Sequence, residues 1–160
     1  MEQWREFFVA VAGSAAALTG LIFVGVSLSL SRMLAIPRLP DRASQALILL
    51  MTVLVVSCIC LAREFSHELL GGLLLFIGSL LWIIILMLDL AIYRVTERPY
   101  KRHYRAMIPF NQLATLPYII AGATILEYGI GGLYWLLPAV IFSFMKSVVD
   151  AWVILVEIHR

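Results

Sequence analysis

The last apolar stretch of this chain, residues 133–157, is long enough to cross a bilayer and carries four polar side chains of interest. They are Ser143, Lys146, Asp150 and Glu157, and spacings of three, four and seven residues place them on one face of a helix. A charged side chain in hydrocarbon costs roughly 2.5–3.5 kcal/mol on insertion scales, so such residues usually face protein or water. We therefore expect neighbouring helices or an aqueous path beside this face.

Lys146 and Asp150 form the strongest candidate site. A lysine four residues before an aspartate can contact it on a helix. One interpretation is a buried ion pair that holds the last helix against its neighbours. The other is a charged lining, in which Lys146 sets ion preference or Asp150 accepts protons. The spacing leaves both open.

The amino-acid composition indicates that the chain is a membrane protein. Hydrophobic residues make up 62% of the 160 residues, against about 45–50% in soluble domains, and charged residues make up 14%, against about 25%. The apolar residues gather in runs of about 20 residues, the length of a membrane span. We expect an all-α, polytopic transmembrane helix bundle in a single membrane domain, residues 1–160, with about five spans at residues 7–30, 43–62, 69–93, 106–126 and 133–157.

The distribution of lysine and arginine predicts the orientation. The N-terminus and the second and fourth loops carry two such residues, whereas the first and third loops and the C-terminus carry nine. Because positive loops stay in the cytoplasm, we expect the N-terminus outside and the C-terminus inside. The basic, tyrosine-containing segment 94–105 is typical of a cytoplasmic membrane edge, so no nucleic-acid partner is expected.

Small residues recur along the first run at steps of three and four. Among them are Gly13, Ala17 and Gly20, with Ser27 and Ser31 further along the same face. Such a seam lets another helix backbone approach closely, within the chain or between copies. A pore wall in which Ser27 and Ser31 face water is the alternative.

The third and fourth runs add supporting polar residues. Asp89 lies about one turn inside the end of its span, within reach of loop arginines or of the polar face of the last span. Asn111 and Gln112 lie between Pro109 and Pro117, which predict a kinked or partly broken helix because a proline frees a backbone carbonyl. Either a structural kink or part of a polar passage fits this segment.

Other chemistry is not indicated. His67, His103 and His159 lie in loops or the tail, and Cys58 and Cys60 point to nearly opposite faces of one helix. The sequence has no metalloprotease, phosphate-loop or hydrolase-elbow motif. We therefore expect no enzyme activity, no metal and no cofactor.

Two stretches, WREFFVAVAGSAAALTGLIFVGVSLSLSRMLAIPRLPDRA (residues 4–43) and GGLYWLLPAVIFSFMKSVVDAWVILVEI (residues 131–158), resemble a family of small bacterial integral membrane proteins of unassigned function. Some members are labelled modulators of an ATP-dependent membrane protease. The resemblance implies five helices in the bacterial inner membrane. The family pattern ends in N-A-W-V-L-L-V-E-I, so Asp150 stands where asparagine is usual, and Lys146 is also a departure.

Two functions therefore remain open. The first is an oligomeric ion or proton channel lined by the first and last spans. The second is an accessory or regulatory protein that binds a larger membrane complex or protease, with Lys146 and Asp150 as a structural ion pair. The expected partners are the lipid bilayer, further copies of the chain and, for the second function, that larger complex.

Overall fold

The computed structural model describes residues 2–36, 39–62, 66–95 and 98–158, which are helical apart from short turns and contain no strand. The expected all-α fold is confirmed. The elements in chain order are α1 (Glu2–Leu28), α2 (Leu30–Leu34), α3 (Leu39–Leu61), α4 (His67–Val95), α5 (Arg98–Tyr128), the 3-10 helix η1 (Gly129–Trp135) and α6 (Leu136–Ile158).

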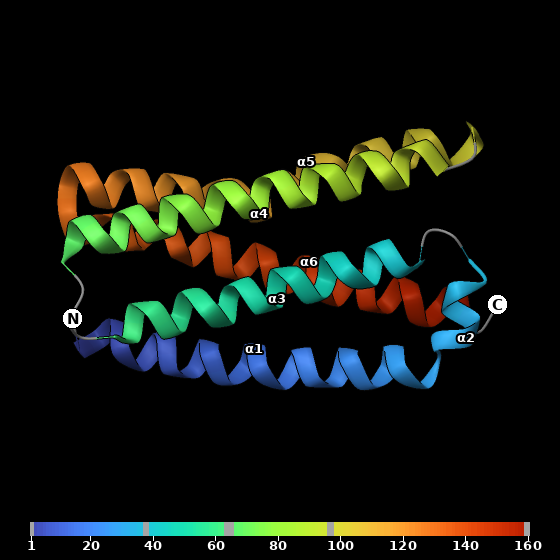
Figure 1. Ribbon diagram of the computed structural model, residues 1–160, viewed down its shortest axis with the longest axis horizontal. Helices are drawn as coiled ribbons and strands as arrows, with labels where there is room; N and C mark the ends of the chain where they lie inside the picture. Colours follow the sequence, from blue (N-terminus) through green and yellow to red (C-terminus); the bar gives the residue numbers. More distant parts are fainter. Residues whose placement is uncertain (1, 37–38, 63–65, 96–97, 159–160) are drawn as a thin grey trace.

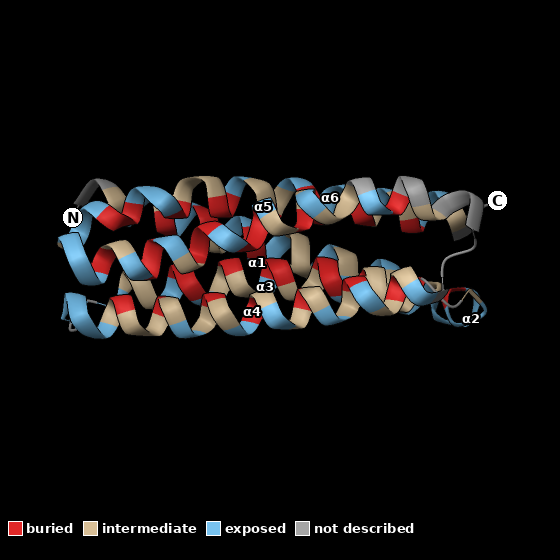
Figure 2. Cartoon of the chain, turned by 90° about the horizontal axis from the view of Figure 1, so that it is seen from above, coloured by how far each residue is buried: buried red, intermediate tan, exposed pale blue. Residues whose placement is uncertain are grey.

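The five long helices lie side by side and alternate in direction, so that α1 begins and α6 ends at opposite ends of an elongated bundle (Figure 1). Helices α4 and α5 form one side, α3 and α6 lie in the middle, and α1 covers the other side of α3. Buried residues follow the inward faces of the helices along the bundle (Figure 2). A continuous core therefore holds the helices together.

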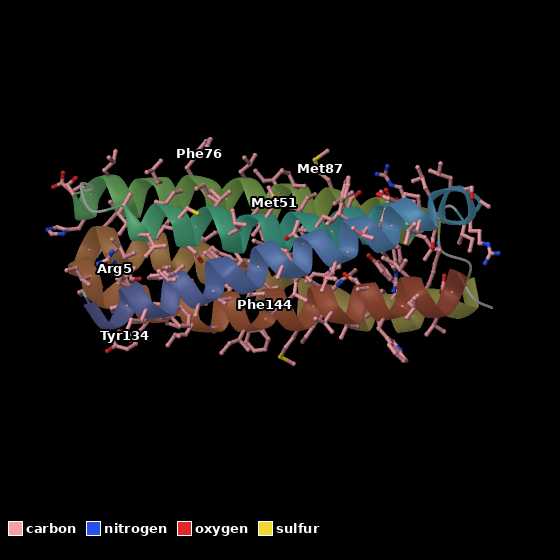
Figure 3. The ribbon with its side chains drawn as sticks, turned by 90° about the horizontal axis from the view of Figure 1, so that it is seen from below. Arg5, Met51, Phe76, Met87, Tyr134 and Phe144 are labelled. Atoms are coloured by element: carbon pink, nitrogen blue, oxygen red, sulfur yellow. The ribbon has the colours of Figure 1, made fainter. Side chains whose placement is uncertain are left out.

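The outer surface of the bundle is apolar. Large side chains such as Phe76 and Met87 point away from it (Figure 3) and are 66% and 65% exposed. Within the described residues, four helical stretches are long and apolar enough to cross a membrane: Trp4–Leu28, Leu39–Leu61, His67–Arg94 and Met107–Glu157, the last of which combines most of α5 with η1 and α6. The length and the surface of these helices indicate a membrane protein.

Three local predictions are corrected. Of the kinked or partly broken helix expected at Pro109 and Pro117, the break is absent, because α5 continues through both prolines; helices of this kind tolerate prolines because neighbouring groups satisfy the freed carbonyls. The expected basic loop 94–105 is largely helical, because α4 ends at Val95 and α5 begins at Arg98. Residues 32–42, between the first two expected spans, were expected to form the first loop, but the short helix α2 and the start of α3 occupy most of them.

Helices α4 and α5 approach each other closely at glycines. A Cβ atom added at Gly78 of α4 would lie 2.9 Å from the backbone nitrogen of Ile119 and 3.0 Å from the carbonyl carbon of Tyr118, both on α5. A Cβ atom at Gly122 of α5 would lie 2.7 Å from Cα of Leu75. Such contacts are shorter than a side chain allows, so these two backbones meet because the residues are glycines.

Helix α1 is attached along one face only. Val11 and Ala15 are buried against Val53 of α3 and Val140 of α6. Gly13 and Gly20 lie on the exposed side, where an added Cβ atom would have no neighbour within 4 Å. Further along, α1 and α6 border an apolar groove of about 360 Å³, whose lining includes Leu21, Gly25, Val148, Trp152 and Leu155.

Basic and aromatic side chains meet at the end of the bundle where α3 and α5 begin and α4 ends. Arg42 lies 5.7 Å from the ring centroid of Tyr104, and Lys101 lies 5.0 Å from that of Tyr93. Of the residues on which the predicted orientation rests, Arg38, Arg63 and Arg160 lie outside the described residues. The orientation stays a prediction.

The α4–α5 contact gives a stability test with a control on the same helix. Gly78→Ala is expected to lower the free energy of unfolding by about 1–3 kcal/mol, because the new methyl group meets the α5 backbone. Gly72→Ala meets nothing within 4 Å and is expected to be neutral, or stabilising by up to about 1 kcal/mol. Denaturant unfolding in detergent, followed by circular dichroism, measures both. Equal effects would contradict the close contact.

Candidate functional site

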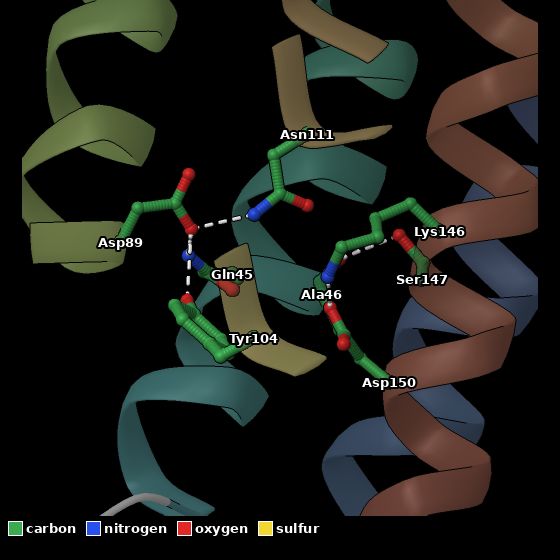
Figure 4. Close-up of polar contacts among 8 residues, drawn as sticks. All are labelled: Gln45, Ala46, Asp89, Tyr104, Asn111, Lys146, Ser147 and Asp150. Atoms are coloured by element: carbon green, nitrogen blue, oxygen red, sulfur yellow. Dashed lines mark hydrogen bonds and ion pairs between the residues drawn. The ribbon is translucent and has the colours of Figure 1, made fainter. Parts of the chain in front are cut away.

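A buried carboxylate, Asp89 of α4, is the centre of a hydrogen-bond network that joins three helices (Figure 4). Its Oδ1 atom accepts hydrogen bonds from Gln45 Nε2 of α3 at 2.7 Å, from the Tyr104 hydroxyl of α5 at 3.0 Å and from Asn111 Nδ2 of α5 at 2.5 Å. Hydrogen bonds to an ionised group are roughly twice as strong as neutral ones. The network therefore ties α3, α4 and α5 together while it stabilises charge on Asp89.

Tyr104 connects this network with the basic end of the bundle, where Arg42 lies over its ring. Burial, and then the neighbouring Asp89 carboxylate, raise the pKa of the Tyr104 phenol above its ordinary value. The hydroxyl therefore keeps its proton at neutral pH. It acts as a donor to Asp89 and does not itself change charge.

Some polar atoms beside this network have no hydrogen-bond partner among the described residues. They are Asp89 Oδ2, Asn111 Oδ1 and Gln112 Nε2, all buried. The other amide atom of Gln112, Oε1, accepts a hydrogen bond of 2.5 Å from Trp82 Nε1. Buried polar groups are normally satisfied, so the free carboxylate oxygen of Asp89 distinguishes this site from an ordinary structural network.

The polar face of α6 points into the bundle, against α3 and α5. Lys146 contacts Asp150 through a short ion pair one helical turn away. Ser147 donates a hydrogen bond of 3.1 Å to the Ala46 carbonyl oxygen of α3. Ser143 lies 3.2 Å from the Tyr118 hydroxyl and donates to the Ala114 carbonyl oxygen, both on α5. Neighbouring helices therefore cover the face at these four positions.

The two groups of polar residues form a single layer of the bundle interior. Gln45 bonds to Asp89, while the carbonyl oxygen of the next residue of α3, Ala46, accepts a hydrogen bond from Ser147 of α6, so adjacent residues of α3 join the two groups. We call these residues the polar layer: Gln45, Asp89, Tyr104, Asn111, Ser143, Lys146, Ser147 and Asp150. All are buried, and together they bring two carboxyl groups and one ammonium group into an apolar bundle.

Other residues singled out in the sequence lie away from the polar layer. Ser27 is exposed on α1, where its hydroxyl donates to the Phe23 carbonyl oxygen at 2.8 Å, and Ser31 is exposed on α2. Ala17, like Gly13 and Gly20, is exposed on α1. Glu157 is partly exposed near the end of α6. The structure thus does not bring the serines of the first span to the polar face of the last.

Gln45 and Tyr104 belong to the polar layer but were not among the residues singled out from the sequence. An amide side chain within an apolar run is costly in hydrocarbon, so the position of Gln45 near the start of the second span is a usable signal. Tyr104 gave none, because segment 94–105 resembles a membrane-edge loop until its helical structure is known.

The donor set of the described residues does not resemble a metal site. No group of three or more histidine, cysteine, aspartate or glutamate side chains comes together among them. Cys58 and Cys60 are free cysteines, the first exposed and the second half-buried. Carboxyl, amide, hydroxyl and ammonium groups in one buried layer can instead hold and exchange protons or interact with small ions.

No protein-family model, no curated protein and no solved structure matches this chain. The resemblance of residues 4–43 and 131–158 to a bacterial membrane protein family stays a prediction.

The ion pair gives a second stability test. Lys146→Met leaves Asp150 buried without its partner and is expected to lower the free energy of unfolding by about 3–5 kcal/mol. The double variant, with Asp150→Leu in addition, removes both charges and is expected to recover most of that loss. Denaturant unfolding of the two single variants and the double variant measures the coupling. Strictly additive effects would show that the pair is not coupled in the folded protein.

Proposed function

We propose that this protein moves small ions or protons across a membrane through the polar layer inside each bundle. The observation that carries the proposal is the burial of Asp89, Lys146 and Asp150, which are 1%, 3% and 1% exposed. Stability alone does not require such residues, since apolar side chains of similar volume are often neutral or stabilising in place of a buried ion pair. Ionisable residues inside membrane bundles usually mark ion or proton pathways.

The path that we propose lies within one bundle. The interior position of Lys146 and Asp150, against α3 and α5, supports this choice. The oligomeric channel expected from the sequence, lined by the first and last spans, would place Ser27 and Ser31 beside the charged pair, whereas the two serines are exposed outside the bundle and Lys146 and Asp150 are buried inside it. Ser143, Lys146 and Asp150 of α6 are therefore kept in the proposal, whereas Glu157 and those two serines are not.

We also propose five membrane crossings, with α5 and α6 as separate spans. Figure 1 shows α5 and α6 running in opposite directions on either side of η1, and Tyr118 of α5 lies beside Ser143 of α6. With 31 and 23 residues, they are about 46 Å and 35 Å long, enough for a hydrocarbon core of about 30 Å. The lysine and arginine bias supports an outer N-terminus and a cytoplasmic C-terminus, and the family resemblance supports the bacterial inner membrane.

Ion flux into sealed liposomes tests the proposed function. Protein-containing liposomes are expected to pass protons or small cations faster than empty ones, and Lys146→Met and Asp150→Asn are expected to change the rate or the ion preference. Ser27→Ala is the control, because its hydroxyl bonds only to its own helix and is expected to leave flux unchanged. Absence of flux at any pH and voltage, with folded protein, would contradict the proposal. A changed flux in Ser27→Ala alone would favour a pore lined by α1.

A second candidate function, an accessory protein of a larger membrane complex, is favoured by the outer face of α1. Gly13, Ala17 and Gly20 are exposed there and make a surface on which another helix can pack closely. Within the described residues no helix of the same chain covers Gly13 or Gly20. We propose that another copy of the chain, or a larger membrane protein such as a protease, packs on this face.

Substitution on this face separates association from folding. Gly13→Leu and Gly20→Leu are expected to leave the helical content and the unfolding midpoint of the single chain nearly unchanged, because nothing lies within 4 Å of the new Cβ atoms. They are expected to weaken association, measured by crosslinking and light scattering in detergent. Ala15→Leu is the contrast, since Ala15 is fully buried and its enlargement is expected to destabilise the bundle itself. Unchanged association in both glycine variants would exclude this face as the contact.

A further inference from the structure

The two carboxyl groups of the polar layer have different surroundings. Asp150 is held by an ammonium group of its own helix, Lys146, and the two charges compensate each other. Asp89 has no such direct partner among the described residues; its hydrogen bonds come from uncharged groups. When Asp89 is ionised, the layer therefore contains one negative charge more than the Lys146–Asp150 pair can balance.

The hydrogen bonds of Asp89 are also confined to one oxygen. All three donors, Gln45 Nε2, the Tyr104 hydroxyl and Asn111 Nδ2, bond to Oδ1, as Figure 4 shows for this cluster. The other oxygen, Oδ2, is buried and has no partner among the described residues. An ionised carboxylate only accepts hydrogen bonds, whereas a protonated one also carries an O–H group. Oδ2 is the atom of Asp89 that can take a proton without disturbing any of the three hydrogen bonds.

We propose that the polar layer binds a proton and that the proton binds at Asp89 Oδ2, an assignment that rests on the proposed function. Binding forms one O–H bond and neutralises the carboxylate. Release returns the proton to the path and leaves a carboxylate whose charge is stabilised by the three donors at Oδ1. The same three hydrogen bonds thus serve both forms, and neither form needs a rearrangement of the helices.

The charged and titratable groups around Asp89 are consistent with this assignment. Tyr104 of α5 keeps its proton, and Lys146 of α6 is engaged by Asp150. Arg42 of α3 lies over the Tyr104 ring, 5.7 Å from its centroid, at the basic end of the bundle. Asp89 is the group of this set that can change charge while every other contact is kept.

A metal cation fits the site less well than a proton. A hard cation needs several oxygen atoms turned toward it. The side-chain groups that bond to Asp89 present N–H or O–H hydrogens to it, which stabilise a carboxylate and repel a cation. A proton needs only the one free oxygen.

Infrared difference spectroscopy of the full-length protein in liposomes tests the assignment. The chain has three aspartates, Asp41, Asp89 and Asp150, so carbon-13 labelling of aspartate confines the signal to three carboxyl groups. We expect a protonated-carboxyl band that appears and disappears reversibly with pH, is lost in Asp89→Asn and is kept in the control Asp41→Asn. A band lost in Asp150→Asn but kept in Asp89→Asn, or no reversible band at all, would overturn the assignment.

A second variant, Tyr104→Phe, tests the same assignment if Asp89→Asn does not fold. Tyr104→Phe removes one hydrogen bond to Asp89 and leaves the ring in place, so it is expected to shift the position of the same band. An unshifted band would place the proton on another aspartate. Replacing choline by sodium at constant pH is expected to leave the band unchanged, and its disappearance would identify a sodium site instead.

Failure of the inference and failure of the proposed function give different results. If the reversible Asp89 band is observed but no proton flux is measured, Asp89 binds a proton and the proposed conduit is wrong. If ion flux is measured but the band is not observed, the conduit is supported and the assignment of a proton to Asp89 is wrong.

Discussion

The free-energy cost of holding charge away from water constrains the whole bundle. Asp89, Lys146 and Asp150 lie where an unpaired charge costs several kcal/mol, so each needs a partner placed with hydrogen-bond accuracy. Asp89 of α4 is bonded to groups on α3 and α5, and Ser143 and Ser147 join α6 to the same two helices, so the four helices must keep a fixed register along their axes. A slip of one helical turn between any two of them would separate a donor from its acceptor.

The close glycine contact of α4 with α5 helps to fix that register. Gly78 and Gly122 bring the two backbones together, and the same two helices supply Asp89 and Asn111. A helix pair held by backbone contact has little freedom to slide, because the contact exists only where the glycines meet. Apolar packing thus defines the distance across which the buried hydrogen bonds form.

The sequence predicted the architecture better than it predicted the site. Run lengths and composition are enough for an all-α membrane bundle, and the spacing of Lys146 and Asp150 indicated a shared face on which the two can contact each other, as they do. That Gln45 and Tyr104 bond to Asp89 could not be predicted, because they lie 44 and 15 residues away and meet it only through tertiary packing. The row of small residues on α1 is a second example. Their spacing predicts that they share one face of the helix, but it does not predict which neighbouring helix covers that face.

Every residue of the polar layer lies on α3, α4, α5 or α6, and α1 and α2 contribute none. Helix α1 packs apolar residues against α3 and presents Gly13, Ala17 and Gly20 outward. The chain is thus divided into two parts with separate constraints, although it forms one bundle. Residues of the outer face of α1 can change while the polar layer stays intact, so the proposed packing of other membrane proteins and the proposed chemistry of the interior are open to independent variation.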